Sequence, residues 1–282
     1  MRATIKLGGS VVSFEKDGFP KTIDEIKKRG PEFINTAAID GFAVQLKEEL
    51  DKGDLEVVLA NGVGPFGHYL VKQNVDQETV HESVSYLNSV IVERLRTQGI
   101  QAVSVSPYDY CYETGVKSVD ALWGPISAAL KEGKVPVSHG DCAPSNAKGL
   151  TGYNVISADD VVVTAAEWWP ANAALMFMDV SGVYTGHPRD PASKFVASIP
   201  ADEEAKTAEE FVARMQELGI IFGSGKQSDV TGGIAAKVWK LYNLTARTGI
   251  NSRLAGLTTD PLCDVLSATS GTMIYKREEA NG

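Results

Sequence analysis

Glycine and lysine residues close to the start of the chain have the types and spacing needed to hold a phosphate. The segment IKLGGS ends an apolar stretch and carries Lys6 ahead of Gly8, Gly9 and Ser10. Glycines let backbone N–H groups approach an anion closely, and a lysine adds positive charge. A glycine pair alone is more often a tight turn without a ligand, so this prediction depends on the motifs that follow.

A second glycine-rich segment, GVGPFGH, follows the next predicted strand and contains Gly62, Gly64, Gly67 and His68. It is neither a dinucleotide-binding fingerprint nor a P-loop. Ligands bind at the carboxyl ends of parallel strands, so two such loops after two strands favour phosphate binding over simple turns. A single histidine is more often structural than functional, but the position of His68 at the end of this loop makes it a candidate ligand contact.

Two carboxylates stand at a predicted strand-to-helix junction. The segment ISADD contains Ser157, Asp159 and Asp160. Acidic residues at a helix start stabilise the helix, and a capping residue contributes about 1 kcal/mol. The functional alternative is that one carboxylate orients catalytic lysines or binds Mg²⁺. Both interpretations stay open from these residues alone.

Two later segments carry further candidates. MDVSGVYTGHPRDP ends a predicted strand with Asp179 and a turn-rich loop. DVTGGIAAK places Thr231, Gly232 and Gly233 at a helix start, with Lys237 about one turn further on. A helical lysine is by default a solvated surface residue, so Lys237 becomes a candidate only in combination with the other motifs.

The composition excludes several classes of function. The chain has 282 residues, 43% of them hydrophobic, which is enough for a large core. No apolar run approaches the roughly 18 residues of a membrane span. The formal net charge of -9 argues against nucleic-acid and anionic-membrane binding, although local lysines still allow a small anionic substrate. Three distant cysteines and a start without an apolar signal region predict a cytoplasmic, reducing location.

Strand and helix patterns alternate along the chain. This alternation predicts an α/β fold, a three-layer αβα sandwich with a mostly parallel central sheet. The predicted strands are 3–7, 55–64, 100–107, 135–141, 174–184 and 271–276, and the predicted helices are 35–53, 78–99, 119–133, 159–169, 201–219 and 231–249.

Taken in order, the segments IKLGGS, GVGPFGH, ISADD, MDVSGVYTGHP, DVTGGIAAK and SGTMI resemble the amino acid kinase superfamily. The loop ending in FGH is similar to the branch that contains isopentenyl phosphate kinase and fosfomycin kinase. DVTGG and SADD are closer to isopentenyl phosphate kinase. The resemblance implies one domain over 1–282, with an acceptor-binding lobe at about 1–150 and a nucleotide-binding lobe at about 151–282.

The resemblance also implies roles for the candidate residues. Lys6 and Lys237 would flank the transferred γ-phosphoryl group of ATP, Lys16 would bridge donor and acceptor phosphates, and Asp159 would hold the lysines or assist Mg²⁺. The implied nucleotide-binding residues are Gly8, Gly9, Ser10, Asp179, Gly182, Tyr184, Thr231, Gly232 and Gly233. The implied acceptor-binding residues are Gly62, Gly64, Gly67, His68, Ser157 and Asp160. No residue is predicted to be a metal ligand of its own, and a homodimer is expected.

The second loop departs from the superfamily pattern. Asn61 stands where the superfamily usually has histidine, Val63 replaces a glycine, and Pro65 removes an N–H donor. The acceptor therefore has alternatives: isopentenyl phosphate first, then a phosphonate such as fosfomycin or another small metabolite. A non-catalytic nucleotide sensor is the alternative of another class, and the retained lysines argue against it. A nicotinamide enzyme lacks its glycine fingerprint.

Overall fold

Apolar side chains alternate along the first strand, β1 (Arg2–Leu7), and this alternation decides what covers each of its faces. Ile5 and Leu7 belong to the core beneath helices α3 (Thr36–Asp51) and α5 (Gln77–Thr97). Lys6 points to the opposite face, where helix α9 (Ala158–Trp168) packs. A single strand thus carries both core residues and one buried lysine.

The computed structural model describes residues 1–111, 119–143, 154–222 and 233–277. Its main sheet has eight strands in the order β10-β12-β11-β7-β1-β2-β4-β3. All neighbours in it pair in parallel except β11 and β12. The remaining strands are β2 (Glu56–Asn61), β3 (Ala102–Ser104), β4 (Val135–His139), β7 (Ala173–Met178), β10 (Ser198–Pro200), β11 (Asn251–Gly256) and β12 (Thr272–Tyr275).

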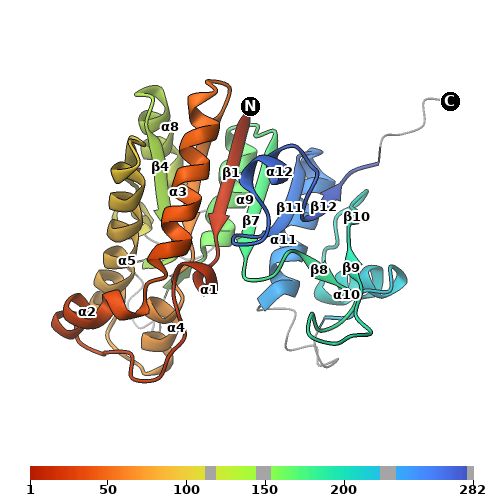
Figure 1. Ribbon diagram of the computed structural model, residues 1–282. Coiled ribbons are helices and arrows are strands. Elements are labelled where there is room, and N and C mark those ends of the chain that lie inside the picture. Colours follow the sequence, from red (N-terminus) through yellow and green to blue (C-terminus); the bar gives the residue numbers. More distant parts are fainter. Residues whose placement is uncertain (112–118, 144–153, 223–232, 278–282) are drawn as a thin grey trace.

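Helices cover both faces of this sheet (Figure 1), and two small hairpins extend from it. The hairpins pair β5 (Asp141–Ala143) with β6 (Asn154–Ile156), and β8 (Val183–Tyr184) with β9 (Phe195–Val196). The other helices are α1 (Gly9–Val12), α2 (Ile23–Arg29), α4 (Pro65–Lys72), α6 (Pro107–Tyr110), α8 (Trp123–Lys131), α10 (Ala208–Glu217), α11 (Gly233–Thr248) and α12 (Leu262–Leu266), with 3₁₀ turns η1 (Gly30–Phe33) and η2 (Asp120–Leu122).

Three buried apolar clusters fill the space between the layers. The largest joins β1, β2 and β4 to α3 and α5, the second joins β7 and β11 to α10 and α11, and the third lies under α8 and α9. The amino-terminal elements occupy one half of the molecule and the carboxy-terminal elements the other, as the red and blue ends in Figure 1 show. Among the described residues, no helix has the length and apolar content to cross a bilayer.

The predicted αβα sandwich with a mostly parallel sheet is confirmed, and several element boundaries are corrected. The strand predicted over 174–184 is two strands, because Gly182 turns the chain at φ +144° between β7 and β8. The helix predicted over 201–219 begins only at Ala208, where the Thr207 side chain caps it by accepting from the Glu210 N–H. The short helices α2, α4, α6 and α12 were not predicted.

Candidate functional site

The two glycine-rich loops pack directly against each other at the carboxyl ends of β1 and β2. A Cβ added to Gly9 would lie 2.5 Å from the backbone nitrogen of Gly64, and one added to Gly62 would lie 2.5 Å from that of Gly9. No side chain fits at such a distance, so glycine is required at these positions for packing alone. The loops predicted as separate anion cradles are therefore one interlocked structure.

Some backbone N–H groups of these loops donate hydrogen bonds within the sheet, whereas others lie at the carboxyl ends of the strands, where a helix begins. Gly8 donates to the Phe177 carbonyl at 2.9 Å, and Gly62 donates to the Leu7 carbonyl at 2.8 Å, so both N–H groups extend the sheet. Gly9 and Ser10 instead open α1, and the first N–H groups of a helix have no acceptor within it. Gly9 and Ser10 are thus better placed than Gly8 for the predicted contact with a phosphate.

A buried ion pair joins β1 to the start of α9. Lys6, only 5% exposed, donates a hydrogen bond to Asp159, which is 7% exposed. The ammonium of Lys237 on α11 lies 3.9 Å from the other Asp159 carboxylate oxygen. The structure therefore brings together three residues that the sequence spreads over more than 230 positions.

The lysines outnumber the carboxylates in this cluster. Burial lowers the pKa of Lys6, and the charges of Lys237 and Lys240 lower it further, against the opposing effect of Asp159. Burial alone would raise the pKa of Asp159, but the charges of Lys6, Lys237 and Lys240 outweigh it and keep that pKa low. The cluster therefore carries an excess of positive charge that a bound anion would neutralise.

His68 lies within the electric field of this cluster. Its ring is reached by solvent, yet the surrounding protein partly desolvates it, and this lowers its pKa. The charges of Lys6, Lys72 and Lys237 lower the pKa further. His68 is therefore neutral at pH 7, so one ring N–H is available to donate a hydrogen bond and the ring is not an imidazolium.

Tyr184, one of the candidate nucleotide-binding residues, lines a mostly apolar pocket near the carboxyl end of β7. The pocket encloses about 560 Å³ and is lined by Val180, Tyr184, Gly186, His187, Pro188, Ile221, Phe222 and Ile234. Asp179 stands at the end of β7, where Ser10 donates to it at 3.4 Å and so links this side to the glycine loops. Gly182 is required by packing, because a Cβ there would lie 2.4 Å from the Thr272 hydroxyl oxygen.

Other predicted site residues have local partners or lie elsewhere. Ser157 caps α9 by accepting from the Asp159 N–H at 3.2 Å. Lys16 is exposed; its ammonium donates to the Glu32 carbonyl at 3.3 Å and lies over the Phe14 ring, so its bridging role stays a prediction. The Gly233 carbonyl accepts from Lys237 at 3.1 Å. Thr231 and Gly232 lie outside the described residues.

The departures in the second loop have a structural explanation. The Asn61 side chain is fully buried and accepts a hydrogen bond from Asn88 at 2.9 Å, so it ties β2 to α5. The Val63 side chain fills the space above two glycines: a Cβ on Gly67 would lie 2.5 Å from its Cγ2, and one on Gly140 would lie 3.0 Å from its Cγ1. The β-branched residue thus packs between α4 and the link from β4 to β5.

Sequence reasoning missed two sets of polar residues at this sheet edge. Lys240 pairs with Asp160 at 2.6 Å, and its spacing from Lys237 would have indicated a shared helix face. His81 contacts the fully buried Asp141 carboxylate at 3.0 Å and stacks on the Tyr108 ring. The histidine and the aspartate lie 60 positions apart, so no local pattern could have joined them.

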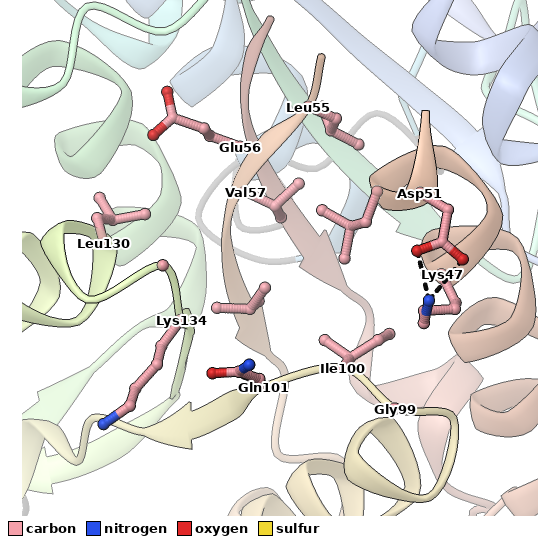
Figure 2. Close-up of a pocket in the computed structure, with 13 residues that line it drawn as sticks. Lys47, Asp51, Leu55, Glu56, Val57, Gly99, Ile100, Gln101, Leu130 and Lys134 are labelled. Carbon is pink, nitrogen blue, oxygen red and sulfur yellow. Dashed lines mark hydrogen bonds and ion pairs between the residues drawn. The ribbon is translucent and has the colours of Figure 1, made fainter. Parts of the chain in front are cut away.

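A pocket at the opposite edge of the sheet contains none of the predicted site residues. Figure 2 shows Glu56 and Val57 at the amino end of β2, with Ile100 and Gln101 from the segment before β3. This pocket of about 340 Å³ lies at the amino ends of the strands, away from the glycine loops. It is therefore not the phosphate site, since ligands of parallel sheets bind at the carboxyl ends.

Comparison with known proteins identifies a family for this chain. The model of the "Amino acid kinase family" matches residues 1–256. The isopentenyl phosphate kinase of Haloferax volcanii is 31% identical over 256 residues, which cover 86% of this chain and 88% of that protein. The isopentenyl phosphate kinase of Methanocaldococcus jannaschii is 28% identical over 197 residues, covering 65% of this chain and 71% of that protein.

Solved structures share the fold at lower sequence identity. The product complex of T. acidophilum isopentenyl phosphate kinase superposes with a TM-score of 0.70 at 20% identity, covering 97% of this chain and 100% of the other. Carbamate kinase from Giardia lamblia bound to AMP-PNP gives a TM-score of 0.63 at 15% identity, covering 98% of both chains. These likenesses establish the fold.

The packing of Val63 predicts a measurable steric coupling. Gly67→Ala should lower the free energy of unfolding by about 1–3 kcal/mol, because the new methyl group collides with Val63. In a Val63→Gly background the same change should be neutral or stabilising, since alanine is favoured over glycine inside a helix by about 1 kcal/mol. Urea unfolding of the single and double variants gives the coupling energy.

Gly41→Ala is the matched control, because a Cβ at this helical glycine of α3 meets nothing within 4 Å. It should stabilise the protein in both backgrounds. If Gly67→Ala were equally destabilising with and without Val63, the proposed contact would be wrong.

Proposed function

This chain belongs to the amino acid kinase family, and from that premise we propose that it transfers the γ-phosphoryl group of ATP to a small phosphorylated acceptor. The first candidate is isopentenyl phosphate, which would become isopentenyl diphosphate. The observation that carries the proposal is the cluster of Lys6, Asp159 and Lys237 beside the interlocked glycine loops. It provides excess positive charge where two anions must meet.

The cluster suits phosphoryl transfer because that reaction depends on positioning and charge neutralisation more than on covalent chemistry. Lys6 and Lys237 would stabilise the negative charge of the transferred group from two sides, while Asp159 holds Lys6 in place. Gly9 and Ser10 would direct their free N–H groups at the nucleotide phosphates. The apolar pocket beside Tyr184 has the size and lining to receive a flat nucleobase.

The expected Mg²⁺ has no site of its own in the described part of the chain. No group of three or more histidine, cysteine, aspartate or glutamate side chains there could hold a metal ion. Asp159 and Asp160 are each paired with lysines, which satisfy their charge.

The acceptor side requires no general base when the acceptor is a phosphate. Its attacking oxygen is already ionised at pH 7, so binding and alignment are sufficient. A neutral His68 would donate one hydrogen bond to this anion, and Gly67 would let it approach. The isopentenyl phosphate kinases among the relatives support this acceptor class.

Two alternatives are separated by one assay. We propose to measure ADP release with isopentenyl phosphate, other alkyl phosphates, fosfomycin and acidic amino acids, with and without EDTA. Turnover with a monophosphate supports the proposal, and preference for fosfomycin indicates a phosphonate kinase. If calorimetry shows ATP binding but no acceptor gives ADP release, the proposal would be replaced by a nucleotide sensor.

The predicted homodimer and the predicted cytoplasmic location are separate questions. Light scattering checks the first, and cell fractionation checks the second.

Replacement of Lys6 or Lys237 should lower kcat more than it weakens ATP binding. Lys237→Ala should lower kcat by ~10²-fold or more, because a charge matched to the transition state is worth several kcal/mol. Lys6→Ala should do the same and also reduce the melting temperature, since it leaves Asp159 without its closest partner. Lys47→Ala, which removes an exposed ion pair with Asp51, is the control and should retain full kcat. Near-normal kcat in Lys237→Ala would exclude that lysine from the transfer step.

Substitution of His68 should lower kcat/KM for the acceptor and leave the KM for ATP unchanged. His68→Ala should reduce kcat/KM for the acceptor by ~10-fold or more, because a hydrogen bond to a charged group is worth roughly 1.5–3 kcal/mol. His68→Gln retains an N–H donor and should recover part of this loss. Because the His68 pKa lies below its usual value, the contribution of this residue should not change between pH 7 and 9. Equal losses for ATP and acceptor, with a lower melting temperature, would indicate a packing role only.

A further inference from the structure

Helices α9 and α11 meet through two lysine–aspartate pairs at the amino end of α9. Lys237 and Lys240 are three residues apart on α11, so they lie on the same helix face. Lys237 approaches Asp159, and Lys240 approaches Asp160. Both aspartates belong to the first turn of α9. The two pairs therefore connect the helices at neighbouring points.

The two ion pairs differ in the distance between ammonium and carboxylate. The Lys240 ammonium lies 2.6 Å from an Asp160 oxygen, which is hydrogen-bonding distance. The Lys237 ammonium lies 3.9 Å from Asp159 and donates instead to the Gly233 carbonyl of its own helix. Because the Lys237 ammonium is too far from Asp159 for a hydrogen bond, this contact does not prevent it from turning toward a phosphate. Lys240 and Asp160 are the pair that holds the two helices together here.

We propose that Lys240 is a positioning residue: its ion pair with Asp160 fixes the first turns of α11 against α9 and so places Lys237 for phosphoryl transfer. This inference rests on the proposed kinase function. It changes the predicted role of Asp160, which becomes a partner of Lys240 rather than a contact of the acceptor. Lys240 itself touches neither phosphate in this arrangement.

The alternative explanation is that the pair only adds stability. The Lys240 and Asp160 side chains are 31% and 36% exposed, and ion pairs with such exposure usually contribute little to stability. The same two helices offer a matched control at their other ends. Arg247 of α11 forms an ion pair with Glu167 of α9, about two turns beyond Lys240. Arg247 also pairs with Glu204, so Arg247→Ala removes two ion pairs, one of them between the same helices, without touching the transfer cluster.

The kinetic test compares Lys240→Ala with Arg247→Ala in the full chain. Lys240→Ala should lower kcat by ~10-fold with little change in the KM for ATP, because a misplaced catalytic group reduces rate steeply. Arg247→Ala should keep kcat within about twofold of the wild-type value, and its melting temperature should be similar to that of Lys240→Ala. The exchanged pair Lys240→Asp with Asp160→Lys should recover more activity than either single change. Equal losses of kcat in Lys240→Ala and Arg247→Ala would overturn the proposal.

A second readout does not depend on turnover. Amide hydrogen exchange in the second turn of α11, at residues 237–240, should be faster in Lys240→Ala than in wild type or Arg247→Ala. Unchanged exchange there overturns the positioning role even if kcat falls. A wild-type protein without ADP release would contradict the proposed function instead, and the exchange experiment would still decide whether the pair fixes α11.

Discussion

The buried pair between Lys6 and Asp159 is the interaction on which the site depends. Charges are buried only with a partner, so Lys6 is tolerated beneath α9 because Asp159 meets it there. Side chains alternate along a strand, and a register shift of one residue in β1 would move Lys6 into the core beneath α3 and α5. The pairing of β1 with β2 and β7 therefore also determines the position of this buried charge.

The surroundings of this pair leave it incompletely neutralised. Lys237 and Lys240 add two positive charges, whereas Asp160 adds one negative charge. Burial lowers the pKa of Lys6, and the repulsion from Lys237 and Lys240 lowers it further. Such an arrangement is unfavourable in the empty protein and favourable when phosphates enter. The interlocked glycine loops bring backbone N–H groups to the same edge and keep side chains out of it.

Sequence patterns were sufficient for the layers, the sheet type and the glycine loops. The apolar pattern predicted Lys6 on a buried strand, and the alternation of strand and helix patterns predicted the αβα class. The partner of Lys6 could only be proposed through resemblance, because Asp159 is 153 positions away. Lys240 was missed although its spacing was visible. The bridging role of Lys16 stays a prediction, and in the structure its ammonium donates to the Glu32 carbonyl. Side-chain partners depend on how distant helices dock, which local spacing does not contain.

The packing of Val63 against Gly67 and Gly140 also constrains how this loop can evolve. A side chain at position 67 would collide with both the Cγ2 and the Cβ of Val63, so it fits only when glycine occupies position 63, and a side chain at position 140 would press tightly on the Val63 Cγ1. The effect of one substitution therefore changes sign with another, a case of epistasis with a steric origin. Substitutions in this loop are therefore expected to be tolerated in one order and not in the reverse.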